Sequence, residues 1–219
     1  MSVDRTPGQF AALQRLLSRR PPPAPGERCD YCSEALAAEH GHLIDLQARR
    51  IMCSCRPCYL VFEPAGAAQG RYKTVPTRYA EVADFAVGDA AWEQLQIPIG
   101  LAFFFHNSLE GRTIALYPGP AGATESQLDL AAWNGVAGAD PVLATLEPDV
   151  EAVVILRRAG TTRCFVVPID AAYKLVGIIR IAWRGFDGGP EAWGKIEAFF
   201  AELRERSANR GRLTARSGP

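Results

Sequence analysis

Five of the six cysteines lie between positions 29 and 58, in two tight groups. The first group is Cys29-Asp-Tyr-Cys32 and the second is Cys53-Ser-Cys55-Arg-Pro-Cys58. Two thiolates separated by two residues converge from one turn on a single ion, and a tetrahedral metal takes four such ligands. Disulfide frameworks instead spread their cysteines along small secreted chains. The clustering therefore predicts a structural metal site with four ligands drawn mainly from these thiols.

The second group offers three thiols for two ligand positions. Cys55 and Cys58 repeat the spacing of Cys29 and Cys32, and residues 33–54, 22 in all, separate the two pairs, where about 15–20 residues are usual. Cys53 with Cys58 also fits known ligand spacings. We favour Cys29, Cys32, Cys55 and Cys58. Because side chains alternate along a strand, Cys53 should lie on the face of Cys55 and pack just above the ion.

Two histidines between the cysteine groups, His40 and His42, leave a second ligand set open. An imidazole could replace one thiolate and give three cysteines with one histidine. A hydrogen bond from a histidine to a metal-bound sulfur is an intermediate case. The plain interpretation is a pair of polar residues that open a strand. His40, His42 and Cys53 are therefore alternates to the four favoured cysteines.

Either zinc or iron can occupy a tetrahedral thiolate site. A closed four-ligand site leaves no position for a substrate, and a module of about 40 residues with few apolar side chains needs its metal to fold. A structural zinc is therefore the predicted metal. The alternative is a single redox-active iron, as in rubredoxin, but such turns place glycine where this chain has Ser33 and Tyr59.

Short elements must position these ligands. His42–Leu46 and Arg50–Cys53 predict a hairpin, and Cys58–Phe62 predicts a short helix after the second cysteine pair. A turn with a cysteine pair, a hairpin and a helix together predict a zinc-ribbon-like or treble-clef-like module over residues 27–70.

Composition divides the rest of the chain. Residues 1–26 predict an amphipathic helix over Pro7–Arg20 and then a proline-rich linker. The small-residue stretch Pro64–Gly70 marks the boundary to a larger domain over residues 71–206. The polar, arginine-rich residues 207–219 are expected to form a disordered tail.

The larger domain mixes strand and helix periodicities. Strands are predicted over Ile99–Phe105, Thr113–Tyr117, Ala152–Arg157, Arg163–Ile169 and Ile178–Trp183. Helices are predicted over Asp89–Leu95, Glu125–Trp133, Ala171–Val176 and Pro190–Arg206. This order of elements predicts an α+β fold with a largely antiparallel sheet.

The overall charge gives no sign of a nucleic-acid or membrane partner. Lys plus Arg number 24 and Asp plus Glu number 24, so there is no basic excess to bind nucleic acid or an anionic membrane. No apolar run approaches the ~20 residues of a membrane helix, and the start of the chain lacks a secretory signal pattern. A cytoplasmic protein is expected.

Outside the cysteine groups, residues capable of chemistry are sparse. Cys164 lies in an apolar strand and suits a buried, inert thiol. His106 ends a strand, where a hydrogen-bonded structural role is expected. No Ser/His/Asp set or phosphate-binding glycine loop is recognisable, so a non-enzymatic protein is expected. The segment Trp183–Gly189 predicts a chain reversal. The alternative is an interface anchor, which Trp183, Arg184 and Phe186 would form if their side chains are exposed.

Three segments together resemble a known family: Cys29 to His42, Cys53 to Phe62, and Trp183–Gly189 with the helix after it. They resemble a bacterial family of unknown function, common in actinobacteria, whose genes lie near those of nickel–iron hydrogenases. The resemblance spans most of residues 27–206. It implies that the partner is a hydrogenase subunit or assembly factor.

The leading hypothesis is a non-enzymatic, zinc-stabilised accessory protein that acts through protein contacts in nickel–iron hydrogenase assembly or maturation. One alternative is a rubredoxin-like redox protein with a single iron. A second alternative is an enzyme with its pocket in the C-terminal domain.

Overall fold

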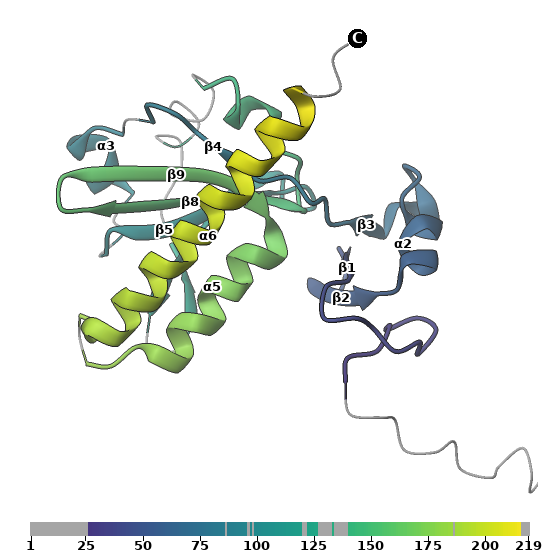
Figure 1. Cartoon of the computed structure of the whole chain (residues 1–219). Helices are drawn as coiled ribbons and strands as arrows, with labels where there is room; N and C mark the ends of the chain where they lie inside the picture. The colour runs from purple at the N-terminus through teal and green to yellow at the C-terminus, as the bar shows by residue number, and fades with distance from the viewer. Residues whose placement is uncertain are drawn as a thin grey trace, which may run out of the picture.

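Antiparallel strands form two separate sheets in the computed structural model of the chain (Figure 1). The structure describes residues 26–85, 87–95, 97, 99–119, 122–126, 133, 140–185 and 187–215. The smaller sheet has the order β2-β1-β3, from β1 (Gly41–Asp45), β2 (Arg50–Ser54) and β3 (Tyr72–Thr74). The larger has the order β4-β9-β8-β5-β6-β7, from β4 (Ala80–Glu81), β5 (Leu101–Asn107), β6 (Arg112–Gly119), β7 (Gly122–Glu125), β8 (Glu151–Arg158) and β9 (Thr161–Pro168). The expected α+β fold with antiparallel sheets is confirmed.

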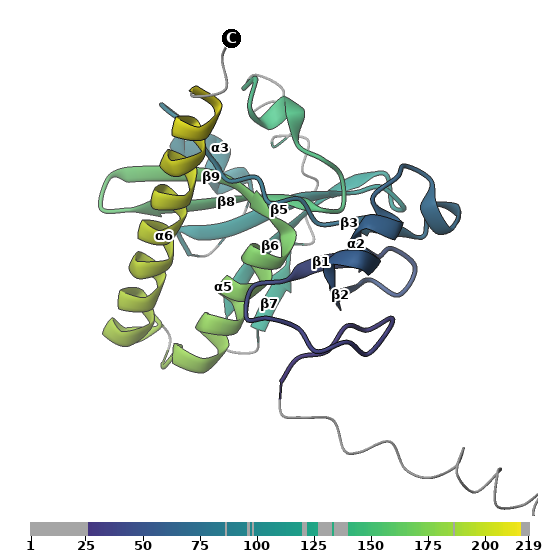
Figure 2. The same ribbon diagram turned by 45° about the vertical axis from the view of Figure 1, so that its right-hand side comes forward.

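Both faces of the six-stranded sheet are buried. Successive side chains of a strand point to opposite sides, so each strand contributes to both faces. Phe103 packs into one core cluster, and its neighbour Phe104 packs into the other. Helices α5 (Ile169–Ala182) and α6 (Gly189–Ala215) cover the first face, as Figure 2 also shows. Residues of α3 (Asp89–Gln94) and of the short 3-10 helix η2 (Leu143–Thr145) pack against the second. The sheet is therefore the middle layer of the larger domain.

Two predicted elements of the larger domain are wrong. The strand predicted over Ile178–Trp183 is the end of α5, which begins at Ile169 and runs to Ala182. The helix predicted over Glu125–Trp133 is wrong at its start, since Glu125 ends β7 and pairs with Leu116 of β6. Residues 127–132 of that prediction lie outside the described residues.

The ends of the chain differ from expectation or fall outside the described part. The final helix, predicted over Pro190–Arg206, continues to Ala215 in the structure, and the disordered tail expected over residues 207–219 stays a prediction. Once a helix is nucleated, each added residue gains a backbone hydrogen bond. The helix predicted over Pro7–Arg20 and the linker up to Pro25 lie outside the described residues.

The cysteine-rich module has the predicted hairpin followed by a helix. β1 and β2 pair from Gly41 with Ser54 to Asp45 with Arg50, and α2 (Arg56–Phe62) follows. The short 3-10 helix η1 (Ala67–Gly70) then leads to β3, which pairs with the other edge of β1. The sheet of the module thus extends to Thr74, past the boundary expected at Pro64–Gly70. Three aromatic rings, with centroids 4.5–5.5 Å apart, join its parts: Tyr31, Phe62 and Tyr72.

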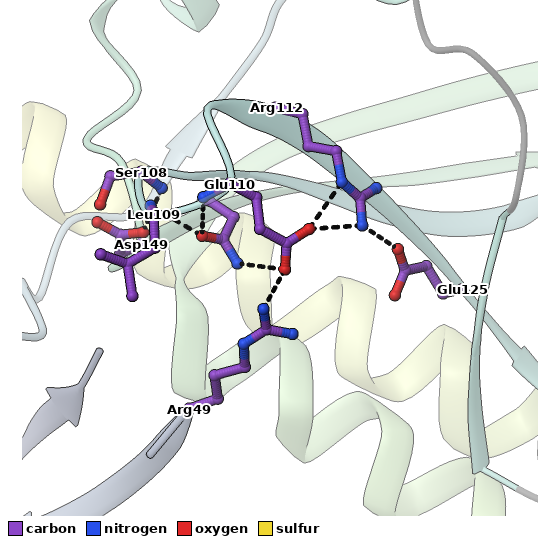
Figure 3. A network of polar contacts seen from close by, with 8 residues as sticks. Arg49, Ser108, Leu109, Glu110, Arg112, Glu125 and Asp149 are labelled. Atoms are coloured by element: carbon purple, nitrogen blue, oxygen red, sulfur yellow. Dashed lines mark hydrogen bonds and ion pairs between the residues drawn. The ribbon is translucent and has the colours of Figure 1, made fainter. Parts of the chain in front are cut away.

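The module lies against one end of the six-stranded sheet through both apolar and charged contacts. Ile44 of β1 and Val75 after β3 belong to the core cluster that also contains α5 and α6 residues. On the charged side, Arg49 in the turn between β1 and β2 pairs with Glu110 in the turn between β5 and β6 (Figure 3). Glu110 also accepts a hydrogen bond from Arg112, which bridges at 2.7 Å to Glu125.

A second ion pair fixes β3 to the larger domain. Lys73 Nζ lies 2.7 Å from Oδ2 of Asp149, and the other carboxylate oxygen accepts the N–H of Ser108 at 2.8 Å. Burial raises the pKa of Asp149, but these donors outweigh it and hold the pKa below its usual value. The carboxylate therefore stays charged while it joins two turns of the larger domain to the module.

Candidate metal centre

A tight turn over residues 28–35 presents the first cysteine pair. The N–H of Cys29 donates to the carbonyl of Glu34, and the N–H of Ser33 donates back to the carbonyl of Cys29, both at 2.9 Å. Ser33, directly after Cys32, has a φ of 64°. This left-handed conformation is the one that favours glycine, so the turn keeps the usual geometry of a metal-binding cysteine pair without its usual residue.

The second pair lies where the hairpin ends and α2 begins. Cys55 is the N-cap residue of α2, with extended backbone at φ −70° and ψ 160°. Its carbonyl accepts the N–H of Tyr59 at 2.9 Å. Pro57 suits the first turn of a helix because no intrahelical partner is needed for an N–H there. Cys58 follows in the same turn, so the rigid start of α2 brings both sulfurs to the same side.

Asp30 holds the two halves of the cluster together. Its carboxylate accepts the backbone N–H of Cys53 at 2.7 Å, and its own N–H donates to the carbonyl of Cys53 at 2.9 Å. These two bonds attach the first turn to β2. The distance between the two cysteine pairs is therefore set by backbone geometry rather than by the side chains alone.

The structure brings Cys29, Cys32, Cys55 and Cys58 together, with all four sulfurs within 4.8 Å of one another. The sulfurs of Cys32 and Cys55 lie 3.5 Å apart. Four thiolates around one zinc, each about 2.3 Å from the ion, would be spaced by about 3.8 Å. Cys29 and Cys55 are buried, Cys58 is half-buried and Cys32 is exposed. The cluster therefore fits one tetrahedral ion, with Cys32 on the solvent side.

The pKa values of Cys29 and Cys58 also favour a cation in the cluster. Burial raises the pKa of Cys29, but backbone N–H groups of Cys32, Cys55 and Tyr31 outweigh it and lower the pKa to about 6. The pKa of Cys58 is raised, by burial and by its neighbouring thiols. Cys29 thus ionises readily, and its negative charge opposes the ionisation of Cys58. A metal ion at the centre reduces this conflict, because its positive charge stabilises the neighbouring thiolates.

The alternate ligands form a separate group beside the four cysteines. The ligand atoms of His40, His42 and Cys53 lie within 4.8 Å of one another, and none of the three belongs to the four-sulfur cluster. Cys53 is the cross-strand partner of His42 in the hairpin. β2 ends at Ser54, so the strand alternation on which the expected position of Cys53 above the ion rests does not reach Cys55, and that position stays a prediction. The ligand set itself stays a prediction.

Cys164 and His106, the other residues considered in the sequence, lie in strands of the larger domain. Cys164 is buried in β9, and burial raises the pKa of its thiol, as an inert side chain requires. His106 is half-buried in β5 opposite Thr113. No helix in the described parts of the chain is both long and apolar enough to cross a membrane.

The turn after α5 is not an exposed aromatic anchor. Trp183 is only 6% exposed and belongs to the main core cluster. A Cβ atom at Gly188, where φ is 87°, would lie 2.9 Å from the Trp183 ring, so glycine is required there. Arg184 is exposed, and Phe186 lies outside the described residues. The hypothesis of an anchor that includes Trp183 is therefore wrong.

Fold and cluster together define an α+β protein with an N-terminal four-cysteine group consistent with a metal-binding module. Residues 28–207 match the model of a family described as "Family of unknown function (DUF5947)", and the chain belongs to this family. The matched region includes all four clustered cysteines and both long helices up to residue 207. No curated protein and no solved structure matches the chain.

Proposed function

We propose that this chain is a non-enzymatic accessory protein, stabilised by zinc, that acts by binding another protein during nickel–iron hydrogenase assembly or maturation. The metal would be structural, because four thiolates complete a tetrahedral shell and leave no position for a substrate. The hydrogenase connection rests on the family resemblance of the cysteine segments and of the segment from Trp183 onward.

One observation carries the proposal of a protein contact. Helix α2 begins inside the cysteine cluster and has no buried residue. Two of its apolar residues are exposed to solvent, Leu60 at 44% and Val61 at 66% of their surface. Tyr31, from the first cysteine turn, is exposed as well. Full burial of one such aliphatic side chain contributes about 1.5–3 kcal/mol. A helix fixed by a metal and carrying exposed apolar side chains suits a surface that a partner covers.

The identity of the metal is the first test. Elemental analysis of protein purified from its native host should find zinc, and the solution should be colourless. A red protein with an absorbance that bleaches on reduction would support the rubredoxin-like alternative, since oxidised iron–thiolate sites absorb visible light. That result would overturn the structural-zinc role.

The second test examines the partner. A tagged chain with Leu60→Glu and Val61→Glu should fold and keep its metal but no longer co-purify hydrogenase subunits or assembly factors. Ile181→Glu is the matched control, because Ile181 is an exposed aliphatic residue, at 71%, on α5 rather than on the module. Equal recovery of hydrogenase components with both variants would refute this surface. Their absence from the wild-type sample would refute the hydrogenase role.

A further inference from the structure

The group His40, His42 and Cys53 has the composition and geometry of a metal site of its own. Its three ligand atoms lie within 4.8 Å of one another, and the two imidazole rings have centroids 4.7 Å apart. His42 on β1 and Cys53 on β2 are directly opposed in the hairpin register. His40 comes just before β1. The backbone of the hairpin therefore fixes two of the donors, and the third is one residue from its start.

An oxygen acceptor lies beside one ring nitrogen of each imidazole and orients the ring. His42 Nδ1 lies 2.7 Å from the carboxylate of Asp170 on α5, and His40 Nδ1 lies 3.0 Å from the carbonyl of Ala37. These oxygens only accept, so in the neutral imidazole each Nδ1 carries the hydrogen and each Nε2 has the lone pair that can bind a metal. Histidines that bind metals have this arrangement, in which a carboxylate or carbonyl fixes the ring through its other nitrogen.

The second ring nitrogen of His40 lacks a hydrogen-bond partner among the described residues. This Nε2 is buried, and the side chain is only 7% exposed. The carboxylate of the exposed Glu27 lies 3.6 Å away, which is close enough for an ion pair with a protonated ring but beyond hydrogen-bond distance. A buried polar atom without a partner costs about 1–3 kcal/mol. A metal ion bound at Nε2 would remove this cost.

We propose that His40, His42 and Cys53 bind a second metal ion, separate from the four-cysteine cluster and exchangeable with solvent. Two imidazole nitrogens and one thiolate select a late transition metal such as zinc, nickel or cobalt, and disfavour magnesium and calcium. The fourth position is available to Glu27 or to water. A groove of about 1380 Å³, lined by both histidines and Asp170, gives the ion a route from solvent. The inference stands independently of the hydrogenase proposal.

Cobalt binding by the full chain tests this site. Protein that holds one equivalent of zinc, after dialysis has removed exchangeable metal, should take up one further equivalent of Co²⁺, with visible bands of a four-coordinate cobalt ion. His42→Ala should abolish this uptake and retain the first metal. His106→Ala is the matched control, since His106 is the one histidine outside the group, and it should bind cobalt as the wild type does.

A milder variant keeps the test valid if His42→Ala fails to fold. Asp170→Asn leaves all three ligands in place but weakens the acceptor that orients His42. Loss of such a partner typically lowers metal affinity about 10–100-fold. We expect that loss for the added cobalt only, with the first metal unchanged. A wild-type chain that takes up no added metal, or an Asp170→Asn variant with unchanged cobalt affinity, would overturn the proposal.

Discussion

Ile44 is the side chain through which we expect the metal module to be coupled to the larger domain. It lies on β1, is buried, and packs in the core cluster that α5 and α6 complete. Leu43, the preceding residue, is fully buried on the opposite face of β1 and is not a member of that cluster. Ile44→Ala therefore opens a cavity at the junction, whereas Leu43→Ala opens one within the module.

The expected magnitude follows from the burial of Ile44. Truncation of a buried isoleucine to alanine costs about 2–5 kcal/mol, and a site at the margin of the core, which can partly collapse, belongs in the lower half of that range. We expect about 3 kcal/mol, which lowers the melting temperature of a chain of this size by about 6–12 °C. The larger domain as well as the module should lose this free energy of unfolding.

Two probes can follow the two parts separately. All tryptophans lie beyond the module, so their fluorescence reports on the larger domain alone; they are Trp92, Trp133, Trp183 and Trp193. Pulsed alkylation of the buried thiols Cys29 and Cys55, read by mass spectrometry, reports on the module. Urea titrations with both probes give one unfolding curve for each part.

Ile44→Ala should move both curves to lower urea, because it removes packing from the core of the larger domain itself. Leu43→Ala should move mainly the alkylation curve. If Ile44→Ala leaves the fluorescence curve unchanged, the coupling is refuted. The stretch Pro64–Gly70 would then separate two independent folding units, as its composition predicts.

Three further variants test other parts of the structure. Cys58→Ser should abolish metal retention by the four-cysteine cluster, because binding and folding of the module are one equilibrium; normal metal content by elemental analysis would contradict the ligand set. Gly41→Ala should cost about 1–3 kcal/mol in urea unfolding, since its Cβ would lie 2.6 Å from the Tyr59 ring, and an unchanged midpoint would refute this contact. Asp149→Asn should cost about 1–3 kcal/mol near neutral pH by removing the pair with Lys73. Because the folded pKa of Asp149 is lowered, its contribution is complete above the usual carboxyl value of about 3.9 and is lost as the pH falls through the lowered pKa. The stability difference between the variant and the wild type should therefore vanish in strong acid, and a difference that persists there would contradict the ion pair.

The error at Ile178–Trp183 shows where local sequence preference fails. The segment is rich in β-branched residues, which favours a strand. The buried residues of α5 nevertheless follow helical spacing: Ala172, Leu175, Val176, Ile179 and Ala182. Ile181 is exposed, as a helix requires at that position and an isoleucine-rich core strand does not. Packing of this stripe on the sheet decides the structure, and the prediction broke the stripe by ending the helix at Val176.

Elements with strong local signals were predicted well. The strands predicted over Ala152–Arg157 and Arg163–Ile169 correspond to β8 and β9, and the helix predicted over Pro190–Arg206 lies within α6. The pairing of β3 with β1, across the expected boundary, had no comparable signal. Strand partners far apart in sequence depend on the register and on the surfaces that the whole fold buries.

The position of Cys53 depends on the same kind of information. Spacing alone allowed it to replace Cys55 as a ligand, and uninterrupted alternation would have placed both on one face. The strand ends between them, so Cys55 turns with the start of α2 toward Cys58 while Cys53 stays opposite His42. One hairpin thus supplies sulfur to two different donor sets. The first is closed and made of four sulfurs, which suits a permanent structural ion. The second mixes nitrogen and sulfur, and its two histidines line a groove, which suits an ion that enters and leaves.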